Sequence, residues 1–256
     1  MNKLIQFIKK PLLFTLTLMP FALIGGIFTG IYMINTYDPK LLVEVVAQVG
    51  STDVLVVITA LQTCMYGAFC GFFGYILADK IGLMKPFKFE KAPLIKTLIF
   101  AGVTAGLLIA DYWFSGGIYP QIKDVTEVGL SLSSIISAIF YGGIIEEIMM
   151  RLFLMSLIVF IVWKLFFRKK TKEEIPTAVF VVVNILIALM FAAGHLPATI
   201  SMFIVLTPYL LVRCFVLNGV AGMLFGNLYR KHGIQYAILC HMFAHIISKL
   251  ILILFI

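Results

Sequence analysis

Long apolar runs separated by short polar segments make up most of the chain. A run of about 20 apolar residues is long enough for a helix to cross the hydrocarbon core of a bilayer. The pattern therefore predicts an all-α fold, a polytopic bundle of transmembrane helices in one integral membrane domain, residues 1–256. The predicted apolar runs are residues 12–34, 54–78, 94–114, 135–167, 175–195 and 234–256, with a less regular region at 197–229.

Composition agrees with a membrane protein and excludes an ordinary soluble one. Of the 256 residues, 62% are hydrophobic and only 12% are charged, which no typical soluble domain matches. The net charge is +8, and the basic residues cluster between apolar runs, as in the cytoplasmic loops of membrane proteins. We therefore expect the partner of this chain to be the lipid bilayer and not a nucleic acid. The four cysteines lie in apolar runs without CxxC spacing and are interpreted as small core residues.

Lysine and arginine positions predict the orientation. They concentrate before residue 12 and in the segments 79–96 and 164–172, which we therefore expect to be cytoplasmic. The start of the chain resembles a signal peptide, but the run 12–34 has no clear cleavage site and is kept as a first span. Segments 35–53 and 111–130 should lie outside, so the run 135–167 begins outside.

Glycines four residues apart recur in several apolar runs. Such spacing lets two helices approach closely in lipid, and tight packing of one bundle is the interpretation adopted here. We find no internal repeat of the kind that transporters carry. The pairs are Gly26/Gly30, Gly67/Gly71, Gly102/Gly106 and Gly222/Gly226.

Two adjacent carboxylates and an arginine interrupt the run 135–167. Each charge at membrane depth costs at least ~2.5 kcal/mol. On a helix, Glu147 and Arg151 are neighbours at i,i+4 and can pair, whereas Glu146 lies about 100° further round. An ion pair that only fixes helix packing needs one carboxylate, so the second one, Glu146, is free to face something else.

Three histidines form a second group of polar residues in the apolar runs. His195 closes one run, with Phe191 one turn earlier, and His241 and His245 share one face of the last run, which Ser248 extends. His232 lies in a polar turn and is interpreted as a loop residue. A lone buried histidine is usually a core residue, but three together with two glutamates favour a catalytic site.

The number of spans depends on residues 197–229. This region is either one long helix or two short ones broken near Asn218-Gly219. A single crossing makes Arg230 and Lys231 cytoplasmic but moves His241 to the leaflet opposite Glu146. We therefore predict two crossings and about eight spans, with the site opening toward the side where the run 135–167 begins.

The order Glu146-Glu147-xxx-Arg151, Phe191-xxx-His195, His241-xxx-His245 resembles the CPBP family. This family comprises the type II CAAX prenyl endopeptidases and the bacterial bacteriocin-processing and abortive-infection membrane proteins. The resemblance covers residues 130–250 and leaves residues 1–129 as an N-terminal three-helix part. It implies an eight-helix intramembrane protease, and its bacterial members suggest a prokaryotic cell membrane.

The resemblance also implies roles for individual residues. Glu146 would activate the water, and His195, His241 and the position of His245 would surround the substrate carbonyl. The last motif of the family usually ends in asparagine, so His245 departs from the pattern and its role toward the oxyanion is in question. The substrate would be a membrane-bound peptide or protein, either prenylated or CAAX-like or with a bacteriocin-type leader.

Two mechanisms are open at this stage. In the first, which we favour, the water is activated by a glutamate without a bound ion, Glu147 assists, and Arg151 and Phe191 support the site. In the second, a metalloprotease, Zn²⁺ would be held by Glu146, His195, His241 and His245. The spacing is not HExxH, so it does not itself imply zinc.

Two other functional classes also remain open. An ion-coupled transporter would use intramembrane glutamates and histidines to carry protons, but the missing repeat argues against it. The second class is a non-catalytic bacteriocin self-immunity protein. Such a protein would not need the complete set of acids and histidines, so their presence argues against this class.

Overall fold

The computed structural model describes the backbone of residues 2–203 and 205–256, with side chains from residue 7 onward. Within these residues the chain is helical and contains no strand, as the apolar pattern predicts. The helices are α1 (Asn2–Thr36), α2 (Pro39–Val49), α3 (Thr52–Lys80), α4 (Lys91–Ile118), α5 (Gln121–Val128), α6 (Leu132–Ser137), η1 (Ala138–Glu146), η2 (Ile148–Met155), α7 (Ser156–Phe166), η3 (Lys172–Glu174), α8 (Thr177–Gly194), α9 (Leu196–Phe203), α10 (Pro208–His232) and α11 (Ile234–Phe255).

Seven helical stretches of the described chain are long and apolar enough to cross a membrane, and not about eight. The region 197–229 contains one short helix, α9, and one unbroken helix of 25 residues, α10. The reason lies at the start of α10, where the Thr207 side chain accepts a hydrogen bond from the Leu210 backbone N–H and Pro208 occupies the first turn. Both are signals for a helix N-terminus, and the helix then continues through Asn218-Gly219.

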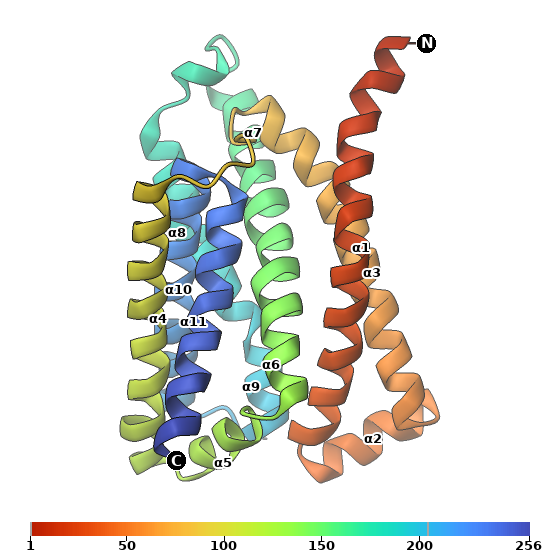
Figure 1. The fold of residues 1–256 in the computed structure, drawn as a ribbon, viewed down its shortest axis with the longest axis vertical. Helices are drawn as coiled ribbons and strands as arrows, with labels where there is room; N and C mark the ends of the chain where they lie inside the picture. Colours follow the sequence, from red (N-terminus) through yellow and green to blue (C-terminus); the bar gives the residue numbers. More distant parts are fainter. Residues whose placement is uncertain (1, 204) are drawn as a thin grey trace.

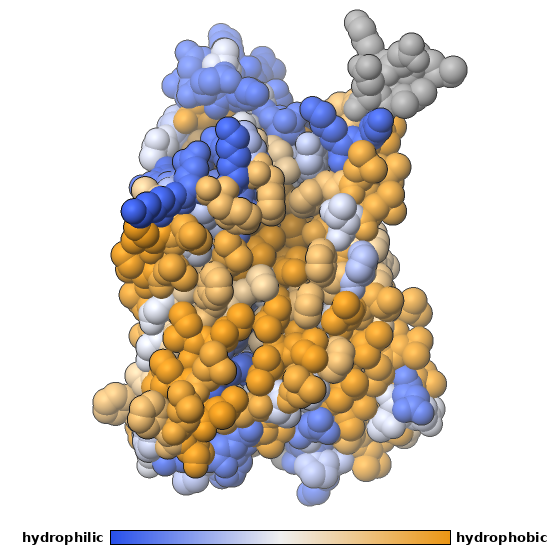
Figure 2. Space-filling model, viewed as in Figure 1, coloured by the Kyte–Doolittle hydropathy of each residue, from blue (hydrophilic) through white to orange (hydrophobic). Residues whose placement is uncertain are grey.

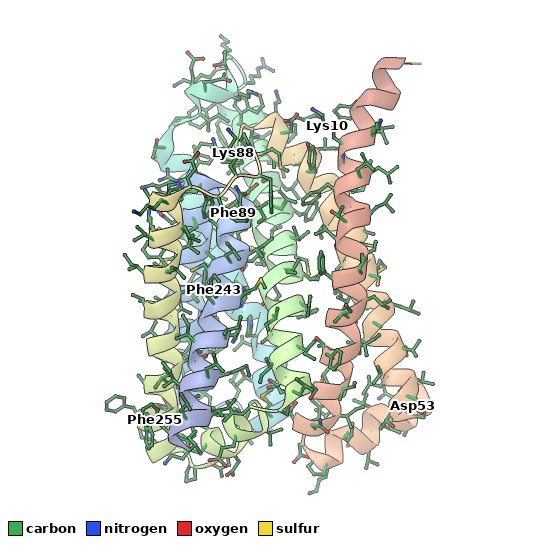
Figure 3. The ribbon with its side chains drawn as sticks, in the orientation of Figure 1. Lys10, Asp53, Lys88, Phe89, Phe243 and Phe255 are labelled. Atoms are coloured by element: carbon green, nitrogen blue, oxygen red, sulfur yellow. The ribbon has the colours of Figure 1, made fainter. Side chains whose placement is uncertain are left out.

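The basic segments gather at one end of the bundle. Figure 1 shows the N-terminus, the α3–α4 connection, the α7–α8 connection and the α10–α11 turn at the upper end. In Figure 3, Lys10 and Lys88 lie toward this end, and Asp53 and Phe255 lie toward the other. With a single crossing by α10, Arg230 and Lys231 join the other basic residues, so all of these segments satisfy the charge rule together.

The side of the molecule seen in Figure 2 is apolar across its middle and polar toward both ends. Many large apolar side chains of the described residues are exposed, among them Val57, Leu165 and Leu254. In water such a surface would be unfavourable, whereas in a bilayer it contacts lipid.

The span from Leu132 to Phe166, which includes α6, η1, η2 and α7, is the centre of the bundle. In Figure 1 it runs between the α1–α3 pair on one side and the group α4, α8, α10 and α11 on the other. Its middle part packs against α1, α3, α8 and α11. Side chains that project from this span therefore meet helices from both parts of the chain.

Glycines permit close packing at three of the four predicted pairs. A Cβ added at Gly26 would lie 2.6 Å from the Cα of Ala60, and one added at Gly222 would lie 3.1 Å from that of Ala188. The pairs Gly26/Gly30 and Gly67/Gly71 pack α1 against α3, and Gly222/Gly226 packs α10 against α8. The prediction is wrong for Gly102/Gly106, where a Cβ would meet no described atom within 4 Å.

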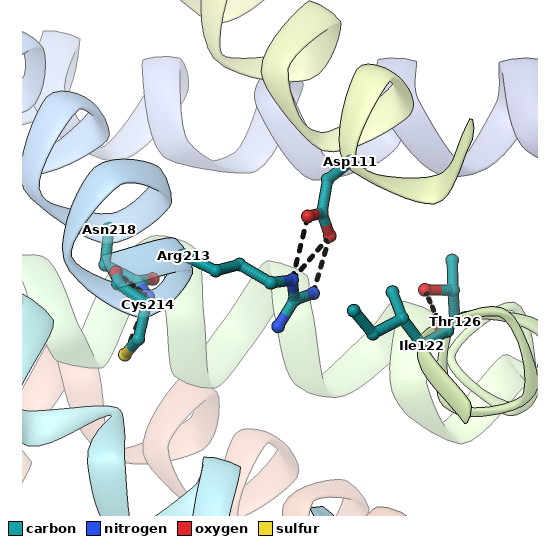
Figure 4. A network of polar contacts seen from close by, with 6 residues as sticks. All are labelled: Asp111, Ile122, Thr126, Arg213, Cys214 and Asn218. Atoms are coloured by element: carbon teal, nitrogen blue, oxygen red, sulfur yellow. Dashed lines mark hydrogen bonds and ion pairs between the residues drawn. The ribbon is translucent and has the colours of Figure 1, made fainter. Parts of the chain in front are cut away.

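An ion pair between Asp111 and Arg213 joins α4 to α10 (Figure 4). The Arg213 Nε donates to Asp111 Oδ1 at 2.8 Å, and Nη2 donates to Oδ2 at 2.5 Å. Segment 111–130 was expected to lie outside the membrane. This prediction is wrong for the first residues of the segment, because α4 continues to Ile118. Asp111 lies inside the span, where its charge requires the partner that Arg213 provides.

Candidate active site

The candidate site begins at an irregular part of the central span. Two π-helical segments, η1 and η2, meet at Glu147, and Glu146 is the last residue of η1. π-helical geometry is rare and is frequent at functional sites. The carboxylate pair singled out by the sequence thus lies near the middle of a 35-residue span, within reach of helices that start from either end.

Glu147 connects two parts of the site through one oxygen atom. Its Oε1 accepts a hydrogen bond from Arg151 Nη1 at 2.9 Å and another from His241 Nδ1 at 2.9 Å. The side chains of Glu147 and Arg151 are fully buried. The pair predicted between these two residues is therefore present, and His241 is a third member that the sequence did not indicate.

The contact between His241 and Glu147 corrects the prediction of how deep His241 lies in the membrane. A single crossing by α10 was expected to separate His241 from the carboxylates, but the imidazole lies against Glu147. The expectation was wrong because it measured depth from the ends of the apolar runs, as if all spans were equally long. The central span has 35 residues and α11 has 22, so equal counts from their ends do not give equal depths, and His241 Nδ1 lies 2.9 Å from Glu147 Oε1 although the two helices start at opposite ends (Figure 1).

Arg151 is fully buried and contacts a carboxylate, a backbone carbonyl and two aromatic rings. Its Nη2 donates to the Gly222 carbonyl at 3.1 Å, and its guanidinium lies over the ring of Phe191 at 4.5 Å and that of Phe225 at 5.4 Å. Aromatic faces stabilise a cation, most strongly where water is excluded. Arg151 therefore fixes the position of Glu147 and, through it, of His241.

Two of the three predicted histidines, His195 and His241, pack against Phe191, and the third, His245, packs against His241. The ring centroid of Phe191 lies 4.6 Å from that of His195 and 6.0 Å from that of His241, and His241 and His245 are 5.1 Å apart. The His195 Nδ1 lies 2.8 Å from the Phe191 carbonyl. Because a carbonyl only accepts, this nitrogen carries the proton, and the same argument assigns a proton to His241 Nδ1 beside the Glu147 carboxylate.

The remaining ring nitrogens of two histidines point toward η1. A Cβ added at Gly142 would lie 3.6 Å from His241 Nε2 and 3.8 Å from His245 Nε2. Glu146 follows Gly142 by four residues, so it lies about one turn further along a similar face of the helix. The absence of a side chain at Gly142 thus leaves both Nε2 atoms open toward the turn that carries Glu146.

Glu146 differs from Glu147 in its surroundings. It is half-buried, and in the part of the chain with described side chains its carboxylate has no hydrogen-bond partner. The structure therefore brings Glu147, Arg151 and His241 into direct contact. It links His195 to this group through Phe191 and His245 through the His241 ring. Glu146, next to Glu147, has no hydrogen bond to any of them among the described side chains. Ser248 is buried, and its hydroxyl donates to the His245 carbonyl at 3.1 Å.

The predicted zinc ligands do not form a metal site in this arrangement. No group of three or more His, Cys, Asp or Glu side chains among the described residues is placed to hold a metal ion. Glu147 Oε1, which contacts His241, also accepts a hydrogen bond from Arg151. We therefore derive no catalytic step through a metal.

Sequence reasoning missed one charged residue close to the histidines. Lys249 lies four residues after His245 in α11, and its ammonium donates hydrogen bonds to the Gly129 carbonyl and the Ser134 hydroxyl. The signal was available, since a lysine inside the run 234–256 is costly at membrane depth.

Comparison with known proteins identifies one family. Residues 128–247 match the sequence model of the family described as type II CAAX prenyl endopeptidase Rce1-like. The matched segment extends from the end of α5 into α11 and contains the motifs of Glu146, His195 and His241. No curated protein and no solved structure matched the chain.

Proposed function

This chain belongs, over residues 128–247, to the Rce1-like family of type II CAAX prenyl endopeptidases, and from this membership we propose its reaction. The family supports an intramembrane protease of the CAAX type in general. The proposed reaction is hydrolysis of a peptide bond in a membrane-associated substrate by a water molecule that a glutamate activates. The observation that carries it is the contact of the buried Glu147–Arg151 pair with His241.

Peptide hydrolysis needs a base for the water, donors for the oxyanion and a proton for the leaving amine. Glu146 is the proposed base, because its half-buried carboxylate has no hydrogen-bond partner among the described side chains and is free to take a proton. The protonated carboxyl can then return that proton during collapse of the tetrahedral intermediate. A glutamine in place of Glu146 has the same shape but cannot take up or return this proton.

His241 is the proposed second proton carrier. Glu147 holds its Nδ1–H at 2.9 Å, which leaves Nε2 as the nitrogen that exchanges a proton with the reacting groups. When Nε2 is protonated, the imidazolium lies beside the Glu147 carboxylate, which stabilises its charge in the manner of a carboxylate that orients a catalytic histidine. The resulting N–H can donate to the oxyanion or to the leaving amine.

His195 and His245 complete the proposed arrangement. His195 donates through Nδ1 to the Phe191 carbonyl, so its Nε2 is available to orient the attacking water. His245, whose Nε2 is directed toward Gly142, is the proposed oxyanion donor. The prenylated, CAAX-like nature of the substrate belongs to this proposal as well and is suggested by the family description.

A comparison of membrane peptides tests the proposed function. Cells that produce the protein are compared with cells that produce Glu146→Gln, by label-free quantification of membrane-associated peptides. We expect a defined set of shortened peptides only with the unchanged protein, and Glu173→Gln, in the exposed η3 segment, as a control that behaves like it. Identical peptide sets in all three would contradict a protease.

We expect His245→Asn to retain substantial activity and His245→Ala to lose on the order of 10²–10³ in rate. An asparagine amide can donate to an oxyanion as an imidazole N–H does, whereas alanine removes the donor. The measurement is kcat/KM on a cleaved membrane peptide. If asparagine were as inactive as alanine, donation would not be the role of this position, and a metal-ligand role would gain support.

We expect peptide hydrolysis to survive removal of divalent metals. The reason is that the proposed base, Glu146, acts directly on the water and that no step passes through an ion. The measurement is elemental analysis of purified protein, followed by activity after strong chelation and after addition of Zn²⁺. Stoichiometric zinc together with chelator-sensitive activity would contradict the metal-free mechanism.

A further inference from the structure

A pocket of about 220 Å³ lies at the basic end of the bundle, between two parts of the chain that are far apart in the sequence. One wall comes from the α3–α4 connection and the first turn of α4, and the other from the end of α10 and the start of α11. In Figure 3, Lys88 and Phe89 lie beside the start of α11, and the Phe89 ring contacts Tyr236. The pocket shares no residue with the candidate active site.

Hydrogen bonds fix the two walls of this pocket to each other. The buried Gln235 side chain donates through Nε2 to the Pro86 carbonyl at 3.1 Å and to the Lys88 carbonyl at 3.2 Å. The Tyr236 hydroxyl accepts a hydrogen bond from the Glu90 backbone N–H at 2.7 Å. The α3–α4 connection is thus held against α11, and a ligand binds without first having to order it.

The lining of the pocket carries an excess of positive charge. It includes three lysines, one histidine and one glutamate, namely Lys85, Lys88, Lys231, His232 and Glu90. The three lysines are exposed, and none of them forms a salt bridge with another described residue. The charge rule accounts for basic residues at this end of the bundle, but not for their position around one pocket with fixed walls. Because like charges repel one another, this arrangement favours an anionic ligand.

Two exposed phenylalanines indicate that the anion belongs to a lipid. Phe87 is 72% exposed and Phe89 is 56% exposed, and in the sequence both are next to Lys88. In water such exposure is unfavourable, whereas at a membrane surface aromatic side chains enter the boundary between headgroups and acyl chains. A soluble anion would use the lysines but would leave these rings without a partner.

We propose that the pocket binds the phosphate group of an anionic phospholipid, with Lys85, Lys88 and Lys231 around the headgroup and Phe87 against its acyl chains. Basic pockets between membrane helices on the cytoplasmic side bind anionic headgroups in this way, and the charge rule assigns this end of the bundle to the cytoplasm. The volume suits a headgroup, since pockets for drug-sized ligands measure about 300–1,000 Å³. The inference goes beyond the proposed function, because lipid binding requires no peptide cleavage.

Titration of lipids into the purified protein in detergent tests this site. We expect phosphatidylglycerol, which is anionic, to raise the midpoint of thermal unfolding until the effect saturates, and phosphatidylcholine, which has no net charge, to have little effect. A lysine near an anionic lipid strengthens binding about fivefold. The variant Lys85→Gln/Lys88→Gln/Lys231→Gln should therefore lose about 10- to 100-fold in apparent affinity for phosphatidylglycerol.

The matched control is Lys169→Gln/Lys170→Gln/Lys172→Gln. It removes the same number of charges from exposed positions at the same end of the bundle, but none of these lysines lines the pocket. It should bind phosphatidylglycerol as the unchanged protein does. If the first variant does not fold, the single variants Lys88→Gln and Lys169→Gln give the same comparison with a smaller expected difference.

Glycerol 3-phosphate separates a lipid site from a site for a soluble phosphate. We expect it to stabilise the protein far less than phosphatidylglycerol does, and Phe87→Ser to weaken the effect of the lipid alone. Equal effects of the two lipids would overturn the proposal, as would equal losses in both lysine variants. Stabilisation by glycerol 3-phosphate as strong as that by the lipid would assign the pocket to a soluble phosphate instead. None of these measurements depends on peptide cleavage, so their outcome is independent of the proposed protease activity.

Discussion

Glu146→Gln is expected to abolish peptide hydrolysis while leaving the bundle folded. Glutamine has the shape of glutamate but cannot accept the proton of the attacking water, and loss of a general base typically costs 10²–10⁴ in rate. Folding should be unaffected because the Glu146 carboxylate is half-buried and has no hydrogen-bond partner among the described side chains. The measurements are turnover of a cleaved membrane peptide and thermal unfolding in detergent.

Glu147→Gln is the matched control for this experiment. Glu147 is fully buried and accepts hydrogen bonds from both Arg151 and His241, so its substitution should lower stability as well as activity. In the proposed mechanism the two adjacent carboxylates thus have different roles, Glu146 as the base and Glu147 as a structural anchor. Unchanged turnover in Glu146→Gln with loss of turnover in Glu147→Gln would assign the base to Glu147 instead.

The fold class followed directly from the apolar pattern, but the number of spans did not. Apolar runs longer than about 20 residues can hardly form anything except membrane helices. The region 197–229 was misinterpreted because two crossings were needed to place His241 at the expected depth of Glu146, whereas Thr207-Pro208 starts one helix, α10, that continues through Asn218-Gly219. A glycine within a helix costs only about 1 kcal/mol, which the packing of the bundle readily offsets.

The site was predictable where its contacts are local and not where they are long-range. The Glu147–Arg151 pair follows from i,i+4 spacing and is present at 2.9 Å. The bond from His241 to Glu147 joins residues 94 positions apart, and no spacing rule predicts it. The same holds for Asp111 and Arg213, which are 102 positions apart, since the pairing depends on α4 lying beside α10.

Arg151→Ala is expected to reduce both stability and activity. It would leave Glu147 as a buried charge without its cation, and removal of one partner of a buried pair typically costs ~3–5 kcal/mol. It would also remove the contacts to the Gly222 carbonyl and to the face of Phe191. His241 would lose its alignment, because the carboxylate that holds it would no longer be fixed.

Arg213→Ala provides the comparison, since it breaks another ion pair of the bundle that does not contact the histidines. We expect thermal unfolding in detergent to shift downward in both variants but activity per folded protein to fall only in Arg151→Ala. The double variant Glu147→Leu/Arg151→Met should recover stability, because replacing a whole buried pair by apolar residues is often neutral or stabilising. It should not recover activity, because His241 then has no carboxylate to orient it, and a double variant that cleaves substrate normally would remove Glu147 from the proposed mechanism.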